Sequence, residues 1–574
     1  MDDVWPWLAG LPPPPGVAGE PSSHTVVTLA ASPDGTTSIV LQAVCAASAE
    51  GDGAEGETTL VDFSLALNGT NGAVRVLWTS GPFAAASSVA LRQNLLARLL
   101  DEVIELSPVV PCLSGNLSSA PETNLDDEVV AGVVQMAETD GSAPTDAAAA
   151  SFFSLALLLR LFWLCAREAP ADTGFLFFQA LGADIERALG DCRPALGLFL
   201  RSVGPDVEER FLRSLGYMLA KLWLLREMQA ESAARQAPPQ PAIPQRALPV
   251  ACLSYATEVH GLWVLKGYAP VVAMPRVTGA ASMPITSLPH EVPEEPALRY
   301  GLVHQQLEVV AQLEYAVRAR DRKFMTVGVR VDNIRVRVAR LGFRKDDADA
   351  GGENVDDDAM EGERHFPSRL RLWVGPRFGA SYATGPSLGR STGNPERDVE
   401  MTRTVKGAFA AHTKLSNAGN FGVPSRVKAK MRSSARTRNR SWRWEQEAEG
   451  SAGVFEGLLC DPVTGTEISS WRAGNGGSAG AADPRNGMRR RYGGPGRAFS
   501  KMRGLVVAGD ELPEEVTWRV GREAEGRTVP WRLGLKAWVS YLPNEVRSRH
   551  FETRCVEWAH EVELPLVVFN GDEM

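Results

Sequence analysis

The chain has 574 residues, of which 44% are hydrophobic and 22% are charged, with a formal net charge of −9 and a pI near 5.6. This length exceeds what one hydrophobic core serves, so we expect two or three domains. The net acidity excludes a chain whose whole surface is built to bind nucleic acid, and it leaves local basic patches open.

The cysteines and the start of the chain bear on its compartment. Seven cysteines are scattered along the sequence, and no two stand at CxxC spacing. This pattern speaks against a disulfide framework or a cysteine-rich zinc site, so we expect no metal and no cofactor. The acidic, proline-rich start "MDDVWPWLAGLPPPPG" is not typical of a secretory signal. We therefore expect a cytoplasmic chain, with a nuclear or peripherally membrane-associated location left open.

Residues 1–106 are predicted to form strands followed by a helix. The β-branched stretches "HTVVTLAA", "TSIVLQAV" and "TTLVDFSLALNG" predict about three strands. Leu91, Leu95, Leu99 and Val103 then recur at helical spacing. The acidic stretch that follows, 107–146, has no Lys or Arg and predicts a disordered linker.

Residues 147–230 are predicted to form a helical domain. Its segment "AAAASFFSLALLLRLFWLCA" is long enough to cross a bilayer. Arg160 inside it favours a buried core helix instead, so we expect no transmembrane span. Five prolines in "APPQPAIPQRALP" then predict a linker over 231–249, because proline removes helix donors and stiffens the chain.

Residues 250–574 are predicted to form an antiparallel β domain, because nearly every apolar stretch in them has period two. Acidic and glycine-rich insertions near 345–363 and 474–498 are expected to be disordered. The expected fold class is therefore α+β. A mainly helical N-terminal domain with a few strands precedes an all-β domain that is either sandwich-like or barrel-like.

One stretch of the β region is repeated: "WRWEQEAEG" at 442–450 returns as "WRVGREAEG" at 518–526. Alternation along a strand would place Trp442 or Trp518 on one face and the glutamates on the other. We predict two related hairpins that turn at Gly450 and Gly526, each anchored by a buried tryptophan. The alternative is a duplicated carboxylate site.

Few residues in the sequence suggest catalysis. "GRSTG" at 389–393 fits the GxSxG nucleophile elbow and makes Ser391 a weak nucleophile candidate. No convincing helix follows this motif, so we assign no catalytic residue. Cys555 and His560 differ by five positions and would point to opposite faces of a strand, which speaks against a metal site there.

Two basic runs, 426–443 and 485–503, contain no acid and are the clearest functional signal. They could contact phosphates of nucleic acid or anionic lipid, or they could offset the acidic loop at 345–363. The candidate anion-binding residues are Arg426, Lys428, Lys430, Arg432, Arg436, Arg438, Arg440, Arg489, Arg490, Arg491 and Arg497.

The C-terminal half also resembles a family of uncharacterised land-plant proteins, in a version typical of grasses. The stretches that carry the resemblance include "YATEVHGLWVLKGYAPVVAMPRV", "HEVPEEPALRYGLVHQQLEVV", "RHFPSRLRLWVGP", "SLGRSTGN" and "FETRCVEWAHEVELPL". They lie between about 250 and 568, and "SLGYMLAKLWLL" extends the similarity toward the N-terminus. The resemblance implies a plant source, and it assigns no activity, ligand or catalytic residue.

We expect a non-enzymatic intracellular interaction or scaffold protein that binds a protein partner through basic loops of its β domain. The alternative is a binder of anionic lipid or nucleic acid through the two basic runs. A hydrolase that uses Ser391 is the third possibility.

Overall fold

The structure is a computed structural model of the whole chain. It describes residues 3–11, 23–47, 59–69, 72–84, 87–107, 127–139, 143–167, 171–236, 253–277, 304–319, 321–341, 365–389, 402–409, 427–434, 442–460, 467–470, 505–508, 512–542 and 550–568.

A four-stranded antiparallel meander forms the N-terminal sheet, in the order β1-β2-β3-β4. Its strands are β1 (Ser23–Ala31), β2 (Ser38–Ala47), β3 (Thr59–Asn68) and β4 (Val74–Ala84). The helices α1 (Val4–Ala9) and α2 (Ser88–Glu105) pack on this sheet, and all four leucine and valine residues of the predicted helical stripe are buried. Ser87 caps α2, since its Oγ accepts a hydrogen bond from the Ala90 N–H at 3.1 Å.

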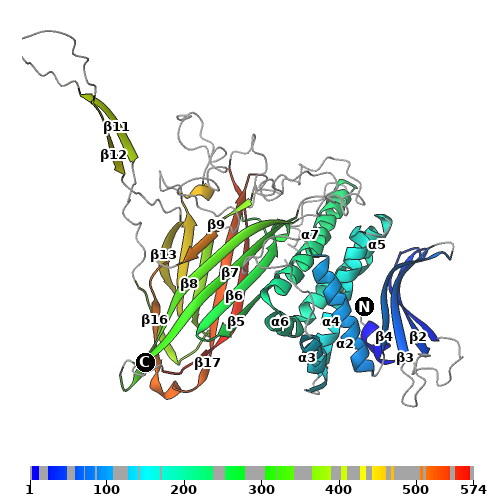
Figure 1. Cartoon of the computed structure of the whole chain (residues 1–574). Coiled ribbons are helices and arrows are strands. Elements are labelled where there is room, and N and C mark those ends of the chain that lie inside the picture. The colour runs from blue at the N-terminus through cyan, green and yellow to red at the C-terminus, as the bar shows by residue number, and fades with distance from the viewer. Residues whose placement is uncertain are drawn as a thin grey trace, which may run out of the picture.

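Five further helices lie between this sheet and the C-terminal strands (Figure 1). They are α3 (Asp127–Thr139), α4 (Ala143–Arg167), α5 (Ala171–Asp191), α6 (Arg193–Ser202) and α7 (Pro205–Gln236). The position of α3 corrects a prediction, because this helix lies inside the stretch 107–146 that was expected to be a linker. Val130, Val133 and Val134 at helical spacing are buried against the other helices, which outweighs the acidic composition.

The apolar segment of α4 lies inside the helical layer. It is the one candidate span among the described helices, and 89% of the window Ala147–Ala166 is buried. Arg160 is buried there and forms an ion pair with Glu102 of α2. The Glu102 carboxylate also accepts a hydrogen bond from Trp78 Nε1 at 2.8 Å and pairs with Arg98 Nε at 2.8 Å. This pairing accounts for a charge within an apolar helix.

The C-terminal strands form two open antiparallel sheets, so of the two predicted forms the closed barrel is wrong. The seven-stranded sheet contains β5 (Leu253–Val259), β6 (Leu262–Pro270), β7 (His304–Ala319), β8 (Phe324–Leu341), β10 (Ala383–Ser387), β15 (Leu505–Ala508) and β16 (Val516–Gly521). The five-stranded sheet contains β9 (His365–Pro376), β13 (Trp442–Glu449), β14 (Ala452–Leu459), β17 (Thr528–Tyr541) and β18 (Glu552–Pro565). A separate pair is formed by β11 (Thr402–Phe409) and β12 (Val427–Ser434).

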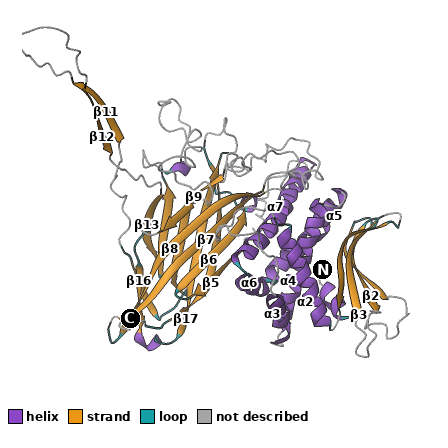
Figure 2. Cartoon of the chain, in the orientation of Figure 1, coloured by secondary structure: helices purple, strands orange, loops and turns teal. Residues whose placement is uncertain are grey.

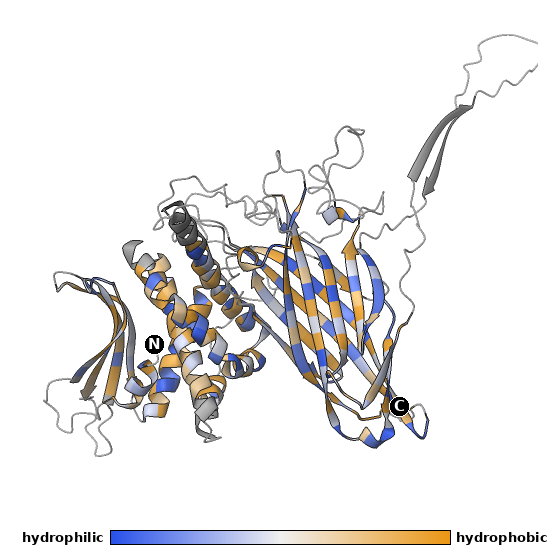
Figure 3. Cartoon of the chain, turned by 180° about the vertical axis from the view of Figure 1, so that it is seen from behind, coloured by the Kyte–Doolittle hydropathy of each residue, from blue (hydrophilic) through white to orange (hydrophobic). Residues whose placement is uncertain are grey.

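The two C-terminal sheets face each other across one hydrophobic core (Figure 2). Hydrophilic and hydrophobic residues alternate along the strands, as Figure 3 shows, and the inward side chains are buried. Trp518 of β16 and Trp531 of β17 meet edge to face in this core, with ring centroids 5.4 Å apart. The short 3-10 helices are η1 (Val271–Ala273), η2 (Ile468–Ser470) and η4 (Arg522–Ala524).

The repeated stretch forms a hairpin in its first copy only. β13 pairs with β14 across a turn at Gly450, which has a φ of 59°. The second copy leaves its strand at Gly521, runs through η4 and turns at Gly526, which has a φ of 76°. Its flanking strands β16 and β17 belong to different sheets, so the predicted second hairpin is wrong. The predicted tryptophan anchors are confirmed, since both Trp442 and Trp518 are buried.

Candidate functional site

Helix α7 carries several charged residues on the side that packs against the seven-stranded sheet. Glu209 and Arg213 are four residues apart, so they share one face of the helix. A glycine follows on the same side: a Cβ on Gly216 would lie 2.0 Å from the Oε1 atom of Gln306 in β7. The absence of a side chain at Gly216 therefore lets α7 approach the sheet closely.

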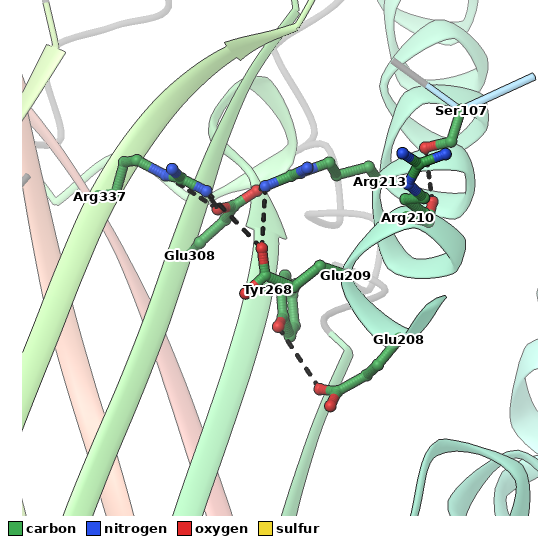
Figure 4. A network of polar contacts seen from close by, with 8 residues as sticks. All are labelled: Ser107, Glu208, Glu209, Arg210, Arg213, Tyr268, Glu308 and Arg337. Atoms are coloured by element: carbon green, nitrogen blue, oxygen red, sulfur yellow. Dashed lines mark hydrogen bonds and ion pairs between the residues drawn. The ribbon is translucent and has the colours of Figure 1, made fainter. Parts of the chain in front are cut away.

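The charged residues of α7 meet charged residues of three strands. We call this group the polar junction; it consists of Glu208, Glu209 and Arg213 of α7, Lys266 and Tyr268 of β6, Glu308 of β7 and Arg337 of β8. Figure 4 shows the Glu308 carboxylate between the guanidinium groups of Arg213 and Arg337. Arg213 Nε lies 3.1 Å from Glu308 Oε1, and Arg337 Nε donates to Glu308 Oε2 at 3.0 Å.

The remaining carboxylates of the polar junction also have cations beside them. Arg213 Nη2 pairs with Glu209 Oε2 at 3.0 Å, within α7. Lys266 Nζ lies 2.5 Å from Glu208 Oε2, and the Tyr268 hydroxyl donates to Glu208 Oε1 at 3.5 Å. Three carboxylates thus face three cations, so the group can be fully ionised without leaving a net buried charge.

Burial and neighbouring charges shift the pKa values of Glu308 and Glu208 in opposite directions. Each of these glutamates pairs with a residue across the contact between α7 and the sheet. Burial by itself would raise the pKa of Glu308, but the charges of Arg337 and Arg213 outweigh it and hold that pKa below its ordinary value. Burial raises the pKa of Glu208, although the Lys266 charge opposes the shift. Glu308 is therefore the firmly ionised centre of the polar junction.

The central ion pair of the polar junction is buried away from solvent. The side chains of Arg213 and Glu308 are 1% and 0% exposed, so a substrate cannot reach their pairs. Such pairs have demanding geometry, and removing one member leaves an uncompensated buried charge. The arrangement therefore fixes the position of α7 on the seven-stranded sheet.

Neither a family model nor a curated protein matches this chain. Among solved structures, the chain is similar to Clostridium perfringens delta-toxin at 9% identity, over 54% of this chain and 96% of that one, with a TM-score of 0.20. It is similar to Clostridium perfringens NetB toxin in its membrane-inserted form at 7% identity, over 54% and 95% of the two chains, with a TM-score of 0.17. A third, "Pore forming protein", gives 10% identity, 54% and 94% coverage and a TM-score of 0.17. TM-scores this low do not establish a common fold.

Most of the residues singled out in the sequence lie outside the described part of the chain. These are Ser391, positions 237–249 of the predicted linker, the insertions near 345–363 and 474–498, and Arg426, Arg436, Arg438, Arg440, Arg489, Arg490, Arg491 and Arg497. The first six positions of the linker predicted over 231–249 belong to α7, so the prediction is wrong there. Lys428, Lys430 and Arg432 belong to β12, which pairs with β11.

Cys555 and His560 lie five positions apart on β18, which places them on opposite faces of the strand. His560 Nε2 lies 2.9 Å from Ser254 Oγ of β5, and Cys555 is on the opposite face of β18. Within the ranges that the structure describes, no group of three His, Cys, Asp or Glu could hold a metal ion.

No pattern in the sequence predicted the polar junction. Glu308 and Arg337 stand in strands of clear period two, at positions that alternate with the buried Leu307 and Val336. Alternation assigns such charges to a solvated face. The usable signal was on α7, where Glu209 and Arg213 share a face beside a stripe of buried apolar residues.

Proposed function

We propose that this chain is a non-enzymatic interaction or scaffold protein, with a helical N-terminal domain and a C-terminal β-sandwich domain held in one fixed orientation. The observation that carries the proposal is the pairing of Arg213 with Glu308, which is sealed between α7 and the seven-stranded sheet. A fixed junction suits a protein that presents surfaces on two domains to a partner at once.

The proposed partner is a protein, and the proposed location is the cytoplasm, with no transmembrane span. Burial of the α4 window Ala147–Ala166 among other helices supports the absence of a span. The acidic balance of the chain, with a formal charge of −9, supports a protein partner over nucleic acid for the molecule as a whole.

Affinity capture with the full-length chain tests this function. The test compares the wild type with a variant in which the Lys and Arg residues of 426–440 and 489–497 are replaced by Gln. Loss of every partner in that variant would place the interaction in the basic loops, and unchanged partners would place it on the two domains. If the wild type enriches no protein over the bare matrix, the proposal fails. Labelling of the wild type but not of Ser391→Ala by a serine-reactive probe would also overturn it.

A second function, binding of anionic lipid or nucleic acid through the basic runs, is favoured by the register of β11 and β12. This register sets Lys406 directly opposite Lys430, and Thr404 opposite Arg432. The register therefore sets basic positions of the two strands side by side along the pair, and Lys and Arg are the residues that contact phosphates. Binding of a phosphate polymer should then weaken steeply with salt, and it should fail in the variant with neutralised basic runs.

A further inference from the structure

Three chain connections and the end of the last strand meet at one end of the two facing sheets. Backbone N–H groups of the connection 521–526 donate to the carbonyls of Lys323 at 2.9 Å, Tyr382 at 3.4 Å and Leu566 at 2.9 Å. The connection between β16 and β17 lies at this end, away from the helical layer (Figure 1). We call the residues gathered here the turn end; they are Asp321–Phe324, Arg377–Tyr382, Arg522–Arg527 and Val567.

The turn end exposes apolar side chains from three separate segments of the chain. Phe378 is 79% exposed, Val567 53% and Phe324 42%. Among the large apolar residues that the structure describes as exposed, Phe378 is the most exposed. A phenylalanine side chain that stays in water does not gain the favourable free energy that its burial would provide. We therefore expect these three side chains to contact a partner.

The exposure of Phe378 is built into the fold. Its ring lies against the Arg532 guanidinium, with the centroid 3.1 Å from Cζ. The Ala380 N–H donates to the Arg377 carbonyl at 3.0 Å and closes a tight turn around Phe378 and Gly379, whose φ is 75°. Because the turn is closed by its own hydrogen bond, the ring is held outward rather than left to fold back.

Basic residues surround these apolar side chains. Arg322, Lys323 and Arg527 are exposed and have no ion-pair partner in the ranges that the structure describes. The acids nearby are mostly engaged: Asp321 accepts from the N–H groups of its own turn at 2.7 and 2.8 Å, and Glu525 pairs with Arg522 at 2.9 Å. The turn end contains five Lys or Arg residues and three acids, Asp321, Glu523 and Glu525, so its net charge is positive.

This combination fits the surface of an anionic bilayer better than a peptide or a protein groove. Phe378, Phe324 and Val567 come from three different segments of the chain, and exposed Lys and Arg follow or precede them at positions 322, 323 and 527. A bilayer interface accepts several separate apolar tips, favours aromatic rings at headgroup depth, and attracts nearby Lys and Arg.

We propose that the turn end docks onto an anionic lipid bilayer. Phe378, Phe324 and Val567 enter the interface, and Arg322, Lys323 and Arg527 contact the lipid headgroups. This docking uses neither the protein partner proposed above nor the basic runs at 426–443 and 485–503.

Vesicle flotation with the full-length chain tests the proposal. The vesicles are phosphatidylcholine alone or phosphatidylcholine with about 30% phosphatidylserine. The wild type is expected to bind the anionic vesicles at least about tenfold more tightly, and Phe324→Ser/Phe378→Ser should lower that binding about tenfold or more. The matched control is Val26→Ser/Val76→Ser, which replaces exposed valines (45% and 53%) of the N-terminal sheet and should bind as the wild type does.

Two further variants distinguish docking through the turn end from misfolding and from uniform adsorption of the chain. Arg322→Gln/Lys323→Gln/Arg527→Gln should reduce binding to anionic vesicles and flatten its salt dependence, with binding to phosphatidylcholine unchanged. Phe378→Trp should bind at least as tightly as the wild type, because the indole ring favours the bilayer interface. A loss of binding caused by misfolding would appear in this variant as well.

Three results would overturn the proposal. They are a wild type that does not bind anionic vesicles, a serine double variant that binds as the wild type does, and equal loss in the valine control. If binding instead disappears only when the basic runs are neutralised, lipid is bound by those runs and the turn-end proposal is wrong, while the proposed protein partner remains to be judged by its own capture experiment.

Discussion

Trp518 and Ser451 join the two C-terminal sheets. The indole Nε1 of Trp518 in β16 donates a 2.9 Å hydrogen bond to the carbonyl of Ser451, which lies in the β13–β14 turn. Trp518 begins the second copy of the repeated stretch, and Ser451 directly follows the first copy. The two copies are therefore neighbours across the core.

We expect Trp518→Phe to destabilise the protein more than Trp531→Phe. Both side chains are buried in the same core and lose the same atoms, but the indole N–H of Trp531 has no hydrogen-bond partner among the described residues. Trp518→Phe also leaves the Ser451 carbonyl without its partner, which should add about 1–2 kcal/mol. Urea unfolding of the two variants measures this difference, and equal losses would mean that the hydrogen bond contributes nothing.

The polar junction predicts unequal effects of two similar substitutions. Glu308→Gln leaves Arg213 and Arg337 facing a neutral amide in a buried place, and it should cost about 3–5 kcal/mol of unfolding free energy near neutral pH. Glu208→Gln removes a carboxylate whose burial is already unfavourable, and it should cost about 1 kcal/mol. Chemical unfolding of both variants is the measurement, and a larger loss for Glu208→Gln would contradict this assignment.

The contributions of Glu308 and Glu208 to stability should respond to acid in opposite ways. The pKa of Glu308 is lowered, so its contribution is present above the ordinary glutamate value and is lost as pH falls through the folded-state pKa. The wild type and Glu308→Gln should therefore converge in stability on acidification. The pKa of Glu208 is raised, so the stability it gives as a neutral acid is present at low pH and is lost as pH rises through its folded-state pKa.

Periodic patterns predicted the secondary structure well. The Leu91, Leu95 and Leu99 stripe is buried in α2, and most of the period-two stretches after 250 that the structure describes are strands, although Ile468–Ser470 forms η2. These patterns work because a single buried face dictates the spacing of apolar residues. In α3 the same spacing, Val130 and Val133, was obscured by the acidic residues around it.

The candidate site depends on residues that are far apart in the sequence. Arg213 and Glu308 are 95 positions apart, and no local pattern relates them. The second copy of the repeat failed as a hairpin for the same reason: its strands pair with β8 and β9, and not with each other. The turn end likewise combines connections that only the sheet order brings together.

Glycine at position 534 should be required for sheet packing. A Cβ there would lie 2.1 Å from Cζ2 of Trp373 and 2.5 Å from the Trp558 carbonyl oxygen. Gly534→Ala should therefore cost about 2–3 kcal/mol through overpacking. The matched control is Gly197→Ala in α6, where nothing lies within 4 Å, and it should gain about 1 kcal/mol from helix propensity. Thermal unfolding of both variants reports the sign, and a neutral Gly534→Ala would show that the indole moves aside.

The buried Lys221 should make the stability of the protein rise with pH. Its ammonium is buried in α7, 5.4 Å from the centre of the Tyr217 ring, and burial lowers its pKa from an ordinary 10.5 to about 8. Between these two values the unfolded chain binds more protons than the folded chain, so stability rises with pH across that window. Over the whole window the gain approaches about 3 kcal/mol.

Lys221→Met removes this titration and provides the reference. Buried Cys165 and Cys192 have pKa values raised to about 12, so their unfolded thiols ionise first and lower stability at high pH in both proteins. The difference in unfolding free energy between Lys221→Met and the wild type cancels this shared effect. Measured by urea unfolding from about pH 7 to pH 9, the advantage of Lys221→Met should shrink as pH rises. A constant difference would mean that Lys221 keeps an ordinary pKa in the folded protein.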